Sequence, residues 1–87
     1  MKYIVLRGAD MTTRADAYAQ IRNALDCTDC GANLDALWDV LTTTCAQLTL
    51  RDPAPMLNGL GSYGCRMLWL LFRAAEETET FRFSVET

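Results

Sequence analysis

The chain of 87 residues contains no histidine. Catalytic triads and histidine-based acid–base pairs are therefore excluded, and only carboxylates, thiols, tyrosines and lysine could perform catalysis. Asp35 and Asp39 could form a carboxylate pair, but on an open helix face they lack the enclosed pocket that separates the pKa values of two catalytic carboxylates. We therefore expect that the protein is not an enzyme.

Long hydrophobic runs are also missing. The longest one covers residues 67–72, which is much too short to cross a membrane. The apolar run of residues 3–6 is too short for the core of a signal peptide. These features predict a protein that has no membrane partner and stays in the cytoplasm.

Basic residues are fewer than acidic ones, 8 Lys and Arg against 11 Asp and Glu. With no basic stripe to neutralise phosphates, we expect no nucleic-acid partner. No lysine follows Gly59, Gly61 and Gly64 as in a phosphate-binding loop, so these glycines are expected in turns. An apolar share of 51% excludes intrinsic disorder, and the length predicts one domain over residues 1–87.

Four cysteines are present, and Cys27 and Cys30 form a Cys-x-x-Cys motif. A thioredoxin-like site would place the first cysteine at the start of a helix, whereas this motif follows one predicted helix and precedes the next. A zinc site would also need the isolated Cys45 and Cys65. We expect no metal or cofactor, with Cys45 and Cys65 as small core residues. A dithiol redox protein using Cys27 and Cys30 is the alternative from another functional class.

The segment that follows is the most informative part of the chain. Its apolar residues have the i, i+3, i+4, i+7 spacing of a core-facing helix: Leu34, Leu37, Trp38 and Leu41. Asp35, Asp39 and Thr42 form a neighbouring stripe, with Trp38 at the border. Asn33 is placed to cap this helix, and Gly31 permits a tight entry. The pattern predicts a half-buried Trp38 beside two exposed carboxylates.

The charge pattern around this helix is one-sided. No lysine or arginine occurs between Arg22 and Arg51, an interval that contains four acids: Asp26, Asp29, Asp35 and Asp39. Such a field attracts a basic surface and speeds encounter with it. The alternative is that Asp35 only complements the helix N-terminus and that Asp39 is only solvated. An adaptor for some other basic protein is a further possibility.

Strand and helix patterns alternate along the chain. Strands are expected at residues 3–6, buried on both faces, and at 45–50 and 80–85. Helices are expected after a Thr13 cap, in the acidic segment and at residues 63–78, with one helical turn at 56–61. Strands separated by helices pair in parallel, so the fold class is α/β, with a three-stranded parallel sheet packed against helices.

Trp69 falls beside Arg66, Arg73 and Glu76 in helical projection, away from the apolar side of its helix. A partly exposed tryptophan of this kind can form a second contact surface. The alternative, which we favour, is that the ring lies under Arg66 or Arg73.

Residues 31–42 closely resemble the signature of the barstar-like ribonuclease inhibitors. The resemblance implies a small bacterial immunity protein, part of a toxin–antitoxin pair, that blocks a basic secreted ribonuclease or nuclease toxin. It also implies that Asp35 and Asp39 enter the phosphate-binding cleft of the enzyme. The partner-binding residues expected on this basis are Asp29, Gly31, Asn33, Asp35, Trp38, Asp39 and Thr42. A monomer is favoured.

The chain also departs from the family pattern. Asp29 and Cys30 stand where the family has aromatic residues before the glycine, and Thr43 and Thr44 stand where a further aromatic follows. Ala74 occupies the place of a carboxylate after a Phe-Arg step. Because aromatic anchors carry much of the energy of an interface, these changes bear on which ribonuclease is bound.

Overall fold

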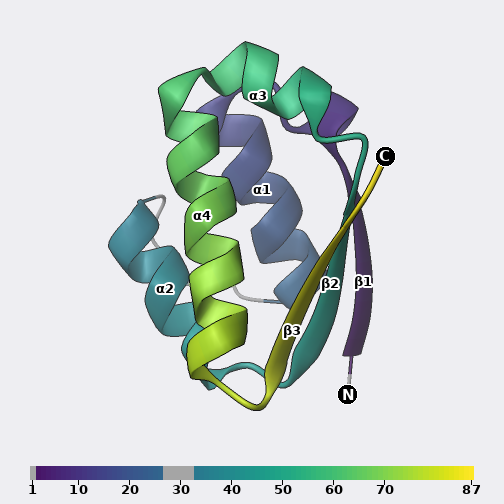
Figure 1. The fold of residues 1–87 in the computed structure, drawn as a ribbon. Helices are drawn as coiled ribbons and strands as arrows, with labels where there is room; N and C mark the ends of the chain where they lie inside the picture. The colour runs from purple at the N-terminus through teal and green to yellow at the C-terminus, as the bar shows by residue number, and fades with distance from the viewer. Residues whose placement is uncertain (1, 27–32) are drawn as a thin grey trace.

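The computed structural model describes residues 2–26 and 33–87 of the chain. Within them, three parallel strands form one sheet: β1 (Lys2–Arg7), β2 (Ala46–Arg51) and β3 (Phe81–Glu86). The order is β1-β2-β3, so β2 is central and the other two strands are edges (Figure 1). Lys2, Ala46 and Phe81 share one row of the register. The predicted parallel sheet is confirmed.

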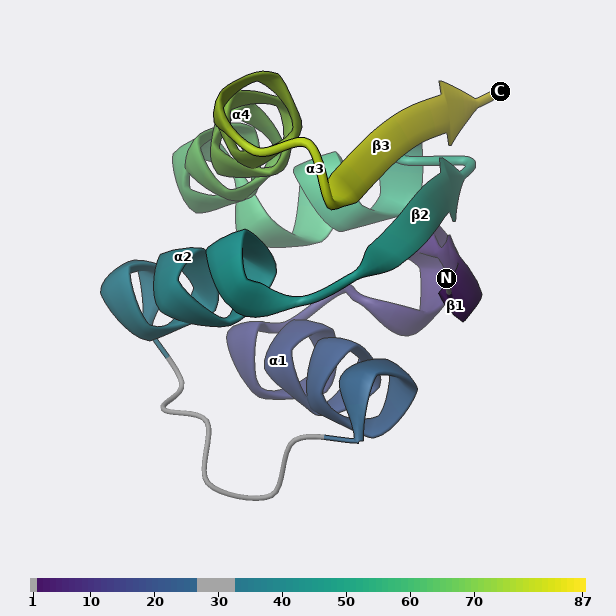
Figure 2. The same ribbon diagram turned by 90° about the horizontal axis from the view of Figure 1, so that it is seen from below.

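Helices cover one face of this sheet (Figure 2). In chain order they are the short 3₁₀ helix η1 (Gly8–Asp10), α1 (Arg14–Leu25), α2 (Leu34–Thr43), α3 (Ala54–Leu60) and α4 (Ser62–Glu77). Since the helices lie on one side only, the core lies between two layers. None of the helices in the described ranges is long and apolar enough to span a membrane.

The prediction that residues 3–6 form a strand buried on both faces is wrong. Ile4 and Leu6 are buried, whereas Tyr3 and Val5 are 76% and 59% exposed. Successive side chains of a strand point to opposite faces, and only one face is covered by helices. Tyr3 and Val5 therefore lie outside the hydrophobic core.

Helix α1 begins and ends with recognisable caps. The Thr13 hydroxyl accepts a hydrogen bond from the Asp16 N–H at 3.1 Å, which confirms the predicted start. At the other end Asp26 adopts a left-handed conformation with φ 54°, and its carboxylate pairs with Lys2 of β1. The pair ties the end of α1 to the edge of the sheet.

The expectation that Gly59, Gly61 and Gly64 all lie in turns is correct only for Gly61, which joins α3 to α4 with φ 61°. Gly59 lies inside α3, and Gly64 is buried inside α4. A Cβ on Gly59 would lie 2.2 Å from the carbonyl oxygen of Thr12. Because glycine has no Cβ, α3 can approach the backbone of Thr12, which precedes α1. The sequence around Gly59 does not predict this contact.

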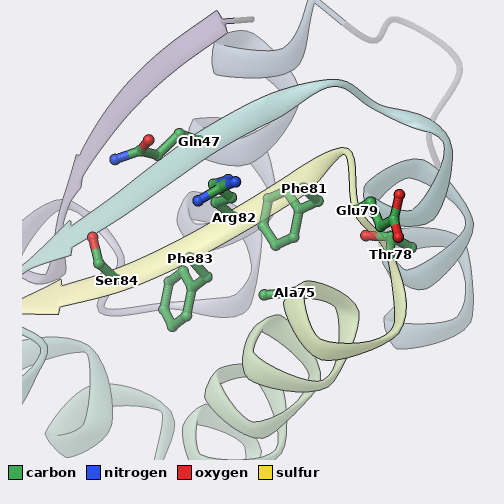
Figure 3. A pocket seen from close by; sticks show the side chains of 8 residues that line it. All are labelled: Gln47, Ala75, Thr78, Glu79, Phe81, Arg82, Phe83 and Ser84. Carbon is green, nitrogen blue, oxygen red and sulfur yellow. The ribbon is translucent and has the colours of Figure 1, made fainter.

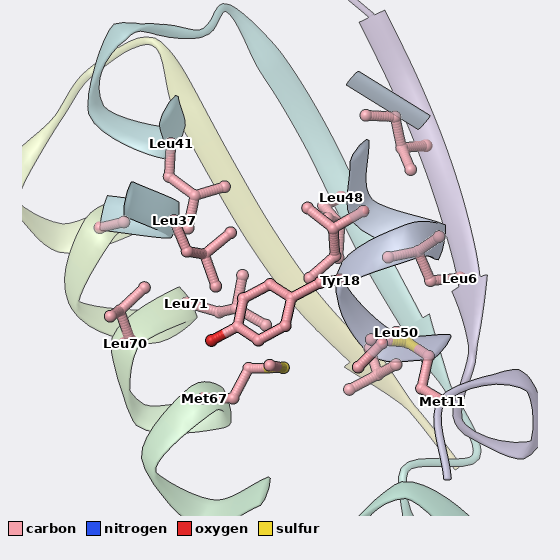
Figure 4. Packing of buried hydrophobic residues seen from close by; sticks show 14 of the residues in the cluster. Leu6, Met11, Tyr18, Leu37, Leu41, Leu48, Leu50, Met67, Leu70 and Leu71 are labelled. Carbon is pink, nitrogen blue, oxygen red and sulfur yellow. The ribbon is translucent and has the colours of Figure 1, made fainter. Parts of the chain in front are cut away.

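Leucine and methionine side chains from both layers fill the core, with Tyr18 of α1 among them (Figure 4). The Tyr18 hydroxyl shares a hydrogen bond with that of Tyr63, and the Arg14 guanidinium lies 4.0 Å from the centre of the Tyr63 ring. Burial, followed by the bond to Tyr63, raises the pKa of Tyr18 well above its ordinary value. The pair connects α1 with α4 through a polar contact in an apolar setting.

Candidate partner-binding site

Core packing and a cap together fix the orientation of α2. The Asn33 side-chain oxygen accepts a hydrogen bond from the Ala36 N–H at 2.8 Å, as predicted. Leu37 and Leu41 are buried in the core, and the helix packs against α4. A helix held in this way has its opposite face directed to solvent.

Asp35 and Asp39 occupy this opposite face, one helical turn apart, and both are exposed. Within residues 2–26 and 33–87, neither carboxylate has an ion-pair partner. By contrast, Asp26 is paired with Lys2. The acidic field predicted for this region thus originates, in the described part of the chain, from α2 itself.

Trp38 is half-buried and packs against the core, beside the two exposed carboxylates. This arrangement is the one predicted from the helical spacing. The indole therefore has one side fixed by the protein and part of its surface open to a partner.

Three consecutive threonines bond back to carbonyl oxygens at the C-terminal end of α2, a feature that the sequence analysis missed. The hydroxyls of Thr42, Thr43 and Thr44 donate to the carbonyl oxygens of Trp38, Asp39 and Val40 at 2.9, 2.8 and 2.6 Å. The run of threonines after an apolar helical stripe was the available signal. These bonds use the hydroxyl protons, so Thr42 has its methyl group and oxygen lone pairs left for a partner.

The structure brings together the predicted residues that belong to α2 and its cap: Asn33, Asp35, Trp38, Asp39 and Thr42. The predicted Asp29 and Gly31, like Cys27 and Cys30, lie outside the described residues. The site can therefore be assessed on the helix and not on the segment that precedes it.

Helix α4 packs beside α2 (Figure 1). Ala74, at the position of the carboxylate in the family pattern, is buried and adds no charge to the surface. Trp69 is 62% exposed, and the Arg73 guanidinium carbon lies 5.4 Å from the ring centre. This cation–π contact confirms the predicted position of Trp69 beside an arginine. Arg73 also forms an ion pair with Glu77 at 2.5 Å.

The prediction that Cys45 and Cys65 are core residues is wrong, because both are exposed free thiols. Cys45 precedes the first residue of β2, and Cys65 lies on the outer side of α4 together with Trp69. The sequence around a single small side chain near the end of a strand or helix does not predict whether that side chain faces the core or the solvent. The described residues also contain no group of three or more acidic or thiol side chains placed to hold a metal ion.

A shallow hollow of about 730 Å³ lies beside β3 (Figure 3). Its lining combines Phe83, Arg82 and Ser84 of β3 with Ala75 of α4, Gln47 of β2 and the turn at Thr78 and Glu79. The lining has hydroxyls at Thr78 and Ser84, but no described hydrogen bond joins either of them to a general base, so nothing here activates a nucleophile.

The comparisons with known proteins show the family of the chain. A sequence model of the family described as Barstar (barnase inhibitor) matches residues 1–86. Among curated proteins no sequence matches the chain.

Proposed function

The chain belongs to the barstar (barnase inhibitor) family, whose members inhibit ribonucleases and are not enzymes, and we propose that it acts through the acidic face of α2. The observation that supports this proposal is the pair of exposed carboxylates, Asp35 and Asp39, without ion-pair partners among the described residues. Charges presented on a rigid helix are suited to a basic cleft.

In the proposed mechanism, α2 occupies the groove where the ribonuclease binds RNA. The two carboxylates take the positions of RNA phosphates and accept charge-assisted hydrogen bonds from arginine or lysine of the enzyme. Inhibition is then both steric and electrostatic. Because a charge buried without a counter-charge is costly, this geometry discriminates against surfaces that lack the basic groups.

The partner that fits this mechanism is a basic secreted ribonuclease or nuclease toxin, and the inhibitor would act as a cytoplasmic immunity protein of the bacterium that produces it. The proposal also includes Asp29 and Gly31, which precede the cap of α2 in the sequence, among the partner-binding residues. Trp38 and Thr42 would contact the enzyme beside the carboxylates.

Replacing Asp39 by Asn tests this role with barnase, the enzyme named by the family description. Removing one partner of a buried ion pair costs about 3–5 kcal/mol, so we expect binding at least about a hundredfold weaker. Isothermal titration of each variant into barnase measures this change. The free energy of unfolding should stay nearly unchanged, because the Asp39 side chain is exposed.

Asp52→Asn is the matched control, because it removes the same charge from an exposed position at the carboxyl end of β2. Asparagine also tolerates the left-handed backbone of Asp52, with φ 50°. Equal loss of affinity in both variants would contradict the acidic-helix mechanism. A wild-type chain that leaves RNA cleavage by barnase unchanged would contradict a barnase-like target.

A further inference from the structure

We propose that β3 is a self-association edge, on which β3 of a second copy of this chain pairs antiparallel about a twofold axis at Ser84. This contact lies outside the acidic face of α2 and is independent of ribonuclease inhibition. Arg82 of each copy would lie opposite Glu86 of the partner subunit.

The backbone of β3 has hydrogen-bonding groups directed away from the sheet. The carbonyl oxygens of Thr80 and Glu86 accept bonds from β2 and the residue after it, at 3.0 and 2.8 Å. Successive residues direct their N–H and C=O groups to alternate sides of a strand. The groups of Phe81, Phe83 and Val85 therefore point to the free edge, where a second strand could pair with them.

The side chains of β3 are self-complementary in one antiparallel register. On the open face the strand carries a cation at Arg82, a hydroxyl at Ser84 and a carboxylate at Glu86. A twofold axis at Ser84 places Arg82 opposite Glu86 of the partner subunit, twice. The same register makes Phe83 and Val85 a hydrogen-bonded, aromatic–β-branched pair, in keeping with the backbone directions.

Arg82 is available for this pairing. In the described parts of the chain it has no carboxylate within ion-pair distance, whereas Arg51 already holds Glu86 at 3.1 Å. Glu86 is exposed and has two carboxylate oxygens, so it can accept from both arginines. Among the described residues, the charge of Arg82 would thus gain a carboxylate partner through pairing with a second copy.

The surroundings of β3 leave room for a partner strand. The hollow described above lies along this strand, and Phe72 of α4 packs edge-on against Phe83 at 4.8 Å while remaining 44% exposed. Val85 of the partner subunit would cover part of this aromatic surface. Two short edges bury less than about 1,200 Å², so we expect a weak dimer whose population rises with concentration.

The other free edge does not have this complementarity. On the same open face β1 carries Tyr3, Val5 and Arg7, a single cation without an acid. Antiparallel pairing of β1 with itself would leave both copies of Arg7 without a counter-charge. The proposed contact therefore uses β3 and departs from the monomer expected from the sequence.

Exchanging the charges at Arg82 and Glu86 tests the proposed register. Sedimentation velocity over a wide range of protein concentration measures how strongly each variant dimerises. Arg82→Glu leaves only acids on the open face of β3, and Glu86→Arg leaves only bases, so each variant alone should dimerise at least tenfold more weakly than wild type. The double variant, and an equimolar mixture of the two single variants, should recover the dimer. Arg7→Glu on β1 is the matched control and should dimerise like wild type.

Circular dichroism and urea unfolding confirm that each variant is folded, and barnase inhibition should be the same in all of them. A monomeric wild type at every concentration would overturn the proposal. So would undiminished dimerisation of Arg82→Glu, or a mixture that stays monomeric. Loss of the dimer in Arg7→Glu would assign the contact to another surface and would also overturn it.

Discussion

Individual acidic residues of this protein have different surroundings, and the surroundings determine what each can do. Asp26 forms an ion pair with Lys2. Asp35 and Asp39 are exposed and have no ion-pair partner among the described residues. An exposed carboxylate without an internal ion pair can interact with a basic partner directly, because no internal ion pair has to be broken first. The proposed binding role therefore depends on Asp35 and Asp39 and not on the net acidity of the chain.

Tyr18 gives a prediction on pH dependence. Burial raises its pKa in the folded protein, so the folded state retains a proton that the unfolded state releases above about pH 10. The stabilisation is complete below that pH, and the free energy of unfolding should fall as pH rises further. Urea unfolding from neutral to strongly alkaline pH should show a steeper decrease for wild type than for Tyr18→Phe. Equal slopes would show that another group causes the alkaline loss.

At the level of elements, α2 depends on its N-terminal cap. Asn33→Ala removes the bond to the Ala36 N–H and should lower the free energy of unfolding by about 1 kcal/mol. Asn33→Asp retains a capping oxygen and should remain close to wild type. Urea denaturation of the three proteins measures the difference, and an alanine variant as stable as wild type would show that packing alone fixes α2.

Helix α3 depends on close approach rather than on capping. In Gly59→Ala, the new Cβ would meet the Thr12 backbone, which cannot move as a flexible side chain can. We expect a loss of roughly 1–3 kcal/mol despite the better helix propensity of alanine. Asn58→Ala, at an exposed position of the same helix, should not destabilise the protein. Thermal or urea unfolding that ranks the two variants in the opposite order would refute this assignment.

The elements differ in how well sequence pattern predicts them. The caps at Thr13 and Asn33 and the apolar stripe of α2 are local signals, and the structure confirms them. The interior position of Gly59 depends on a segment distant along the chain, so no local pattern could reveal it. The one-sided burial of β1 likewise depends on where all the helices pack.

At the scale of the whole molecule, α2 carries acidic residues and no basic ones. The open face of the sheet is mixed in charge, because Arg7, Arg51 and Arg82 lie there together with Glu86. In the proposed mechanism a basic enzyme is attracted to the acidic face of α2, which favours encounter through that face. Association with barnase should therefore be fast at low salt and slower at high salt. Stopped-flow rates independent of ionic strength would contradict this orientation effect.

The acidic-helix mechanism is tested most directly by the double variant Asp35→Asn/Asp39→Asn in an assay of RNA cleavage by barnase. The substitutions keep the shape of both exposed side chains and remove only their charge, so urea unfolding should match wild type. We predict that the folded double variant no longer inhibits cleavage at concentrations where wild type is fully effective. Inhibition as strong as that of wild type would contradict the mechanism, even with the fold as described.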